Sequence, residues 1–211
     1  MDALNKVGIK TTLYYVFEEE LFEENPQHVK SEFDEYEICS LGPQDMQAIS
    51  AAAIPDRKES EDYLLQRLKR GPKCLGVKYR GKIVAFSWYD LTQCNFGGHI
   101  FTLKANEACL FDAYTLSSHR GKGLAPLVRY EVYKELSKLG RNILLSSSDF
   151  FNVSAIRFKR KLNAKLLELR HNIRIRWVFF SIRIKRYRPE ALRIKRVYYI
   201  SQIRKYKISN Y

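Results

Sequence analysis

A short glycine-containing segment between two apolar stretches constrains the fold of this chain more than any other feature. It reads His-Arg-Gly-Lys-Gly-Leu-Ala from His119 to Ala125. Residues 109–116 before it are rich in apolar, aromatic and β-branched types, as in a strand, and apolar residues recur at helical spacing after it until Gly140. Glycines at such a junction let backbone N–H groups approach a ligand, and the helix N-terminus adds a partial positive charge. The sequence therefore predicts a strand, an anion-binding turn and a helix, with a diphosphate as the expected ligand.

The spacing within this turn separates several classes of phosphate-binding loop. It fits neither Gly-x-x-x-x-Gly-Lys-Ser/Thr nor Gly-x-Gly-x-x-Gly, which disfavours a nucleoside triphosphatase and a dinucleotide fold. Residues 120–125 do fit Arg/Gln-x-x-Gly-x-Gly/Ala, and this pattern resembles the coenzyme A pyrophosphate loop of the GNAT superfamily of N-acetyltransferases. Taken alone, a basic Gly-x-Gly turn fits a plain strand-to-helix connection equally well.

The resemblance continues beyond the turn and covers about residues 72–180. Residues 142–147 read as a further strand, and Asn152, Ala155 and Phe158 have the spacing common at the start of the next GNAT helix. The resemblance implies acetyl-CoA, or another acyl-CoA, as co-substrate. No metal is expected, because the cysteines and histidines do not cluster in the sequence. The resemblance also implies a set of coenzyme A-binding positions, in which the strand before the turn splays from its neighbour and lends backbone groups: Tyr114, Thr115, Leu116, Arg120, Gly121, Lys122, Gly123, Leu124, Ala125, Asn152 and Phe158.

The order of the remaining elements predicts an α/β (α+β) fold. A GNAT-like central mixed, mostly antiparallel sheet flanked by helices is expected, with a basic C-terminal extension. The expected strands are residues 33–41, 74–79, 82–91, 109–116, 142–147, 165–169 and 173–180, and the expected early helices are 44–53 and 58–70. We divide the chain into an N-terminal lead-in (1–30, an extra strand or short helix), a GNAT-like domain (31–182) and a basic, aromatic C-terminal extension (183–211).

Positive charge is concentrated near the end of the chain. Residues 157–211 hold 18 Lys and Arg against Glu168 and Glu190, a net charge of +16, so the total of +14 leaves −2 for residues 1–156. The extension is too aromatic for a solvated tail. We expect it to dock on the domain, on a second subunit of a homo-oligomer, or on an anionic membrane surface or acidic carrier protein. Nucleic acid is a less favoured partner, because no RNA-binding signature accompanies the charge.

Composition bounds the class and location of the protein. Its 211 residues, 45% of them hydrophobic, suffice for one domain with a substantial core. No apolar run approaches the roughly 20 residues of a membrane span, and the N-terminus lacks a secretory layout. We expect a cytoplasmic protein, with peripheral attachment at the membrane surface as an alternative. Cys39, Cys74, Cys94 and Cys109 are scattered without metal-ligand spacing, which favours buried free thiols.

The positions of a general base and acid are where the sequence departs from the family pattern. Cys109 and Phe111 occupy the places of the usual basic side chain, and Lys159 occupies the place of the usual Tyr acid. The remaining candidates are Glu107, Asp112 and Tyr114. By strict alternation Asp112 and Tyr114 lie on the other face of the strand from Glu107, and a β-bulge would change the direction of their side chains. Glu107 also reads as a solvated carboxylate, and Asp112 fits a structural ion pair as well as a contact to a substrate amine. A chain of waters is the alternative to any side-chain base.

Three functions follow from these features. The leading one is transfer of an acetyl or other short acyl group from acyl-CoA to the amino group of a small-molecule acceptor, such as an anionic amino sugar. The alternatives are a nucleic-acid-binding protein that uses the basic C-terminal segment, and a non-catalytic acyl-CoA-binding module. The sequence identifies neither the acceptor nor the length of the acyl chain.

Overall fold

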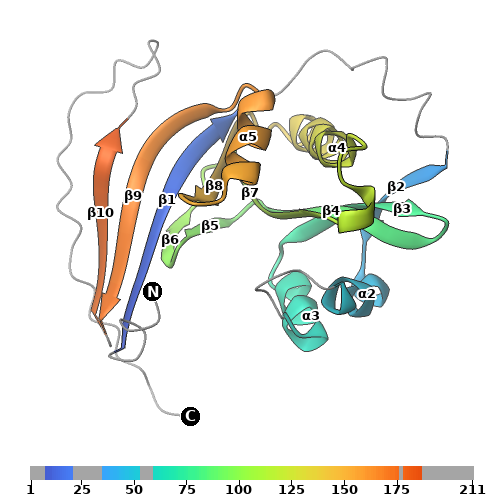
Figure 1. The fold of residues 1–211 in the computed structure, drawn as a ribbon, viewed down its shortest axis with the longest axis horizontal. Helices are drawn as coiled ribbons and strands as arrows, with labels where there is room; N and C mark the ends of the chain where they lie inside the picture. The colour runs from blue at the N-terminus through green and yellow to red at the C-terminus, as the bar shows by residue number, and fades with distance from the viewer. Residues whose placement is uncertain (1–7, 21–34, 53–58, 176–177, 187–211) are drawn as a thin grey trace. The chain divides into compact units, whose positions relative to one another are not determined.

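The computed structural model describes residues 8–20, 35–52, 59–175 and 178–186 (Figure 1). The chain divides into two compact units, and each is described by itself. The larger unit comprises Glu19–Cys94 and Thr102–Ser146, and the smaller one comprises Met1–Glu18, Asn95–Phe101 and Ser147–Tyr211.

The larger unit is built on a mixed, mostly antiparallel sheet, in agreement with the expected fold class. Its strands follow the spatial order β8-β7-β4-β3-β2, and only the pairing of β7 with β8 is parallel. The strands are β2 (Tyr36–Leu41), β3 (Lys73–Tyr79), β4 (Lys82–Asp90), β7 (Glu107–Thr115) and β8 (Ile143–Asp149). Arg80 and Gly81 form the turn of the hairpin that joins β3 to β4.

Helices cover both faces of this sheet (Figure 1). Helix α4 (Leu124–Lys138) packs its apolar side chains on one face, whereas α2 (Met46–Ala51) and α3 (Glu61–Lys69) cover the other. Strand β4 contributes side chains to the apolar clusters on both faces of the sheet. Tyr89 lies in the cluster with α4, and its neighbour Trp88 lies in the cluster with α2 and α3. The expected helix over 44–53 is shorter, since Pro43–Asp45 forms a 3-10 turn before α2.

A buried carboxylate lies beneath α4. Glu19, the last residue of β1 (Ile9–Glu19), is fully buried, and its side chain accepts a hydrogen bond of 2.5 Å from the Tyr133 hydroxyl and another from Ser146. The Nε atom of the equally buried Arg129 lies 3.5 Å from the same carboxylate. Burial first, and then the Glu19 charge, raises the pKa of Tyr133, so this hydroxyl stays protonated and donates.

The smaller unit holds the antiparallel strands β1, β9 (Lys165–Ile175) and β10 (Val178–Arg186), together with α5 (Val153–Lys161). The expected strands 165–169 and 173–180 are wrong in their bounds, because β9 continues through Arg170, His171 and Asn172. Those polar residues resemble a turn in sequence. In the structure Asn172 is buried and hydrogen-bonded, so it is accommodated inside a strand.

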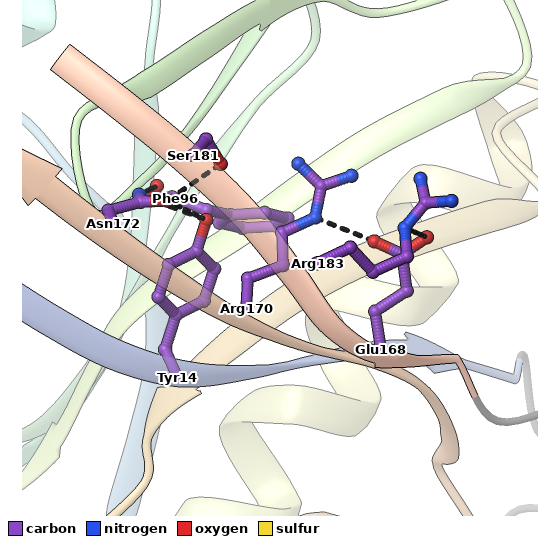
Figure 2. Close-up of polar contacts among 7 residues, drawn as sticks. All are labelled: Tyr14, Phe96, Glu168, Arg170, Asn172, Ser181 and Arg183. Carbon is purple, nitrogen blue, oxygen red and sulfur yellow. Dashed lines mark hydrogen bonds and ion pairs between the residues drawn. The ribbon is translucent and has the colours of Figure 1, made fainter. Parts of the chain in front are cut away.

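Figure 2 shows the polar contacts that fix these strands. The Asn172 amide nitrogen donates to the carbonyl oxygens of Phe96 and Gly97, both at 2.9 Å, and its oxygen accepts from Ser181 at 2.7 Å. Glu168 accepts from Arg170 at 2.6 Å and lies 2.9 Å from Arg183 Nε. Arg183, which begins the expected extension, is therefore part of the strand β10 and of an ion pair.

A disulfide joins Cys94, on β5 (Gln93–Phe96), to Cys109 on β7. The expectation of buried free thiols is wrong for this pair and is confirmed for Cys74, whereas Cys39 is free but only half-buried. The bridged cysteines are 15 positions apart in the sequence. The chain between them forms the hairpin of β5 with β6 (His99–Thr102), so their proximity depends on tertiary packing rather than on a local motif. Among the described residues no group of three or more His, Cys, Asp or Glu side chains is arranged to hold a metal ion.

Several expectations concern the ends of the chain. The lead-in segment contributes β1, so its strand alternative is confirmed for residues 9–19. Residues 1–7, 21–30 and 187–211, which include most of the basic extension, lie outside the described residues. Within the described part of the chain, no helix combines the length and the apolar character needed to cross a membrane.

Candidate active site

The glycine turn connects β7 to α4 in the larger unit, as the sequence predicts. A 3-10 turn at Ser117–His119 follows β7, and α4 begins at Leu124. Gly121 and Gly123 have φ angles of 78° and 77°, in the left-handed region that a side chain disfavours. A Cβ atom added at Gly121 would meet nothing within 4 Å, so the space beside this residue is open.

The backbone of this turn presents a row of N–H groups. The first hydrogen bond of α4 runs from Leu127 N to Gly123 O at 3.1 Å. In the described part of the chain, no protein group accepts from the backbone N–H of Gly121, Lys122, Gly123, Leu124 or Ala125. Orphan N–H groups at a helix N-terminus, with two left-handed residues ahead of them, form a concave donor set that suits an anion.

Cationic side chains add charge to this donor set. Lys122 and Arg120 are both exposed, and the Arg120 Nε atom donates to the Thr115 carbonyl at 3.2 Å. The Arg120 guanidinium also lies 5.7 Å from the centre of the Tyr114 ring. Arg120 is therefore anchored on the last residues of β7, with its charge beside the turn.

A β-bulge lies on β7 just before the turn. In the pairing with β4, Trp88 faces Phe111 and Phe86 faces Tyr114, so Ser87 alone stands opposite Asp112 and Ala113. Asp112 has a φ of +48°. Within the larger unit, the parallel pairing of β7 with β8 spans only Glu107 to Leu110, so beyond the bulge β7 has β4 as its one paired neighbour in this unit. The parallel pairing with β8 therefore ends before the bulge, and the last residues of β7 lead directly into the turn.

The three candidate catalytic residues occupy different environments. Asp112 forms an ion pair of 2.8 Å with Arg67 of α3, which favours its structural role. The Glu107 carboxylate accepts from the Lys104 backbone N–H at 2.9 Å and lies at the start of β7, roughly 26 Å from Thr115 at the usual strand rise. Tyr114 alone lies beside the turn. The Cys109 sulfur is held in the disulfide and cannot act as a thiolate base.

Asn152 and Phe158 lie in the smaller unit. Asn152 caps α5, because its side-chain oxygen accepts from the Ala155 N–H at 3.0 Å. Phe158 lies on α5, and so does Lys159, which is buried with its ammonium 5.4 Å from the centre of the Phe17 ring. The helix expected after Asn152 is confirmed, whereas a role of Asn152 and Phe158 in ligand binding stays a prediction.

Sequence reasoning missed Arg67. Its guanidinium contacts Asp112 and, at 2.5 Å, Glu59, and it lies 4.8 Å from the centre of the Trp88 ring. Burial lowers the pKa of Arg67, but the charges of Asp112 and Glu59 and a hydrogen bond with Tyr63 outweigh burial and raise it. No local pattern marks this residue, because its partner on β7 is 45 residues away.

Comparisons with known proteins support the fold. No family model and no curated protein matches the sequence. A solved structure from Novosphingobium aromaticivorans, named as an acetyltransferase from the GNAT family, has 17% identity and a TM-score of 0.56, and covers 78% of this chain. A Drosophila protein has 17% identity and a TM-score of 0.54, and covers 82% of this chain. A protein of unknown function from Staphylococcus epidermidis has 7% identity and a TM-score of 0.52, with 82% coverage.

The chain spans 65%, 54% and 64% of the lengths of these three proteins. At such low identity the likeness concerns the fold alone. The expected GNAT-like architecture, with a mixed, mostly antiparallel sheet flanked by helices, is confirmed.

Proposed function

We propose that this protein is an acyl-CoA-dependent N-acyltransferase that transfers an acetyl or other short acyl group to an amino acceptor. The observation that carries the proposal is the turn at residues 120–125, where free backbone N–H groups meet two cationic side chains and a helix N-terminus. The fold shared with a named GNAT acetyltransferase supports the same assignment.

The chain's own groups would bind and orient the co-substrate. The N–H groups of Gly121, Gly123 and Ala125 would hold its diphosphate, and Arg120 would contribute charge. The part of β7 after the bulge would contact the pantetheine arm through the backbone of Tyr114 and Thr115. Bound acyl-CoA supplies the activated acyl group, which a neutral amine attacks when the two are held in line, so orientation provides much of the rate.

Binding of coenzyme A is the first expected result. At a hundredfold excess over Kd, the ligand should stabilise the folded chain by about 2.7 kcal/mol, because it binds the native state alone. Titration calorimetry and thermal unfolding with and without coenzyme A measure this effect. A folded chain that shows neither heat nor a thermal shift would contradict the proposal.

Proton removal from the acceptor is proposed to pass through water. Asp112 is paired with Arg67, Cys109 is bridged and Glu107 lies at the far end of β7. Replacing Glu107 with Gln should therefore lower turnover by much less than the roughly 100-fold expected for a true general base. Steady-state rates with labelled acetyl-CoA test this. A loss of that size with unchanged coenzyme A affinity would identify Glu107 as the base.

The pairing of Asp112 and the bridging of Cys109 also favour a second candidate, a non-catalytic acyl-CoA-binding module. Coenzyme A binding without acetylated products, in a cell extract supplied with labelled acetyl-CoA, would favour the module over the enzyme. We further propose a small-molecule amine as acceptor, of anionic type because residues 157–211 carry +16, and a cytoplasmic location.

A further inference from the structure

The bulge on β7 decides which way the strand enters the turn. Phe111 and Tyr114, three positions apart on β7, both pack against the α2–α3 cluster. In a regular strand, residues three apart point to opposite faces. The extra residue therefore reverses the alternation after it, and loss of the bulge would turn Tyr114 and Thr115 to the wrong faces.

The backbone at the bulge is in an unfavourable conformation. Three non-glycine residues in the described part of the chain have positive φ: Arg80, Asp112 and Asn163. Arg80 lies in the β3–β4 turn and Asn163 lies just beyond α5, so Asp112 is the one inside a strand. Aspartate tolerates the left-handed region better than most residues, yet the conformation still needs support from its surroundings.

Arg67 contacts both strands at this point. Its Nη1 atom lies 2.8 Å from the Asp112 carboxylate on β7, and the guanidinium lies 5.6 Å from the centre of the Phe111 ring and 4.8 Å from that of Trp88 on β4. Phe111 immediately precedes the bulged residue, and Trp88 is its partner across the ladder.

Both ionic side chains are largely shielded from water. The exposed fractions are 10% for Arg67 and 14% for Asp112, and Glu59 holds the second amino group of Arg67 at 2.5 Å. A guanidinium held by two carboxylates and packed on the rings of Tyr63, Trp88 and Phe111 has little freedom to move. Its position on α3 therefore fixes the bulged segment against the sheet.

We propose that Arg67 is a positioning residue for acyl-CoA binding: it holds the Asp112 bulge and so sets the register in which β7 enters the glycine turn. This inference rests on the proposed function, because the turn is its binding site. Arg67 acts through Asp112 and the backbone of β7.

Replacing Arg67 with Met tests the inference, since Met preserves apolar contact with the rings and removes the ion pairs. We expect coenzyme A affinity to fall about tenfold, equivalent to about 1.4 kcal/mol of binding free energy, at a temperature where the variant is folded. In hydrogen–deuterium exchange without ligand, peptides covering residues 111–124 should exchange faster. Arg67→Lys keeps a positive charge but loses the planar guanidinium that binds two carboxylates, so its coenzyme A affinity should lie between those of wild type and Arg67→Met.

Arg141→Met is the matched control. Arg141 donates to the carbonyl oxygens of Lys104 and Glu107, both at 3.0 Å, and so supports the opposite end of β7. This control should speed exchange around residues 104–110 and leave coenzyme A affinity within about twofold of wild type.

A double variant separates positioning from general stability. Glycine adopts positive φ without the cost borne by other residues, so Arg67→Met/Asp112→Gly should keep the bulge without the ion pair and recover most of the lost affinity. Wild-type affinity in Arg67→Met would overturn the inference. Equal losses in Arg67→Met and Arg141→Met, with no recovery in the double variant, would also overturn it. If the wild-type chain does not bind coenzyme A, the proposed function fails, and the exchange comparison still decides whether Arg67 holds the bulge.

Discussion

Replacing Gly121 with Ala is expected to weaken coenzyme A binding by at least about tenfold, more than about 1.4 kcal/mol. The added methyl group meets no protein atom within 4 Å, so it projects into the open space where the diphosphate is proposed to lie. A methyl group there blocks the close approach of phosphate oxygens to the backbone N–H groups. Calorimetric titration of the variant with coenzyme A measures the loss.

Gly140 supplies the control for this experiment. Its φ is 71°, close to that of Gly121, and an added Cβ there also meets nothing within 4 Å. It follows the opposite end of α4. Gly121→Ala and Gly140→Ala should therefore lose similar stability, about 1 kcal/mol for a side chain at positive φ, while only Gly121→Ala loses affinity. Equal affinities in the two variants would show that the diphosphate lies elsewhere.

Replacing Glu19 with Ala should lower the free energy of unfolding by about 3–5 kcal/mol. The substitution removes a fully buried carboxylate that accepts from Tyr133 and Ser146 and lies beside the buried Arg129. Removing the carboxylate leaves these buried donors without the hydrogen bonds and ion pair that offset the cost of taking them out of water. Urea denaturation followed by far-ultraviolet circular dichroism measures the change.

Two further variants calibrate the Glu19 result. Glu131→Ala removes a carboxylate from the same helix as Arg129 and Tyr133, but its partner Lys134 is 44% exposed, so a loss of about 0.5 kcal/mol is expected. Glu19→Gln keeps an acceptor oxygen, so its loss of unfolding free energy should lie between those of Glu19→Ala and Glu131→Ala. A Glu19→Ala variant as stable as Glu131→Ala would show that the buried carboxylate contributes little.

Local patterns predicted the parts of the site that local sequence controls. The strand, the two glycines and the helix are adjacent along residues 109–139, so the geometry of the turn could be inferred from composition and spacing. The family resemblance predicted Asn152 at the start of a helix, and the structure confirms it as the N-cap of α5.

Contacts between distant segments could not be predicted in this way. Arg67 and Asp112 are 45 residues apart, and either could have served as a surface charge. Asn172 is of a residue type common in turns. The partners that hold it inside a strand, Phe96 and Ser181, lie on other elements and leave no local signal. The Cys94–Cys109 bridge has no flanking motif, so the sequence favours free thiols at both positions.

Whether the Cys94–Cys109 disulfide is present in a sample depends on the redox conditions under which the protein was prepared. Chains made under reducing and under oxidising conditions would share a sequence and differ by two hydrogen atoms. Both half-cystines are buried, so a reductant reaches the sulfurs only when the surrounding packing opens. We therefore expect a disulfide that has already formed to be reduced slowly after transfer into a reducing buffer. The bridged and the reduced chains should then be seen as two bands of different electrophoretic mobility when the protein is unfolded without reductant.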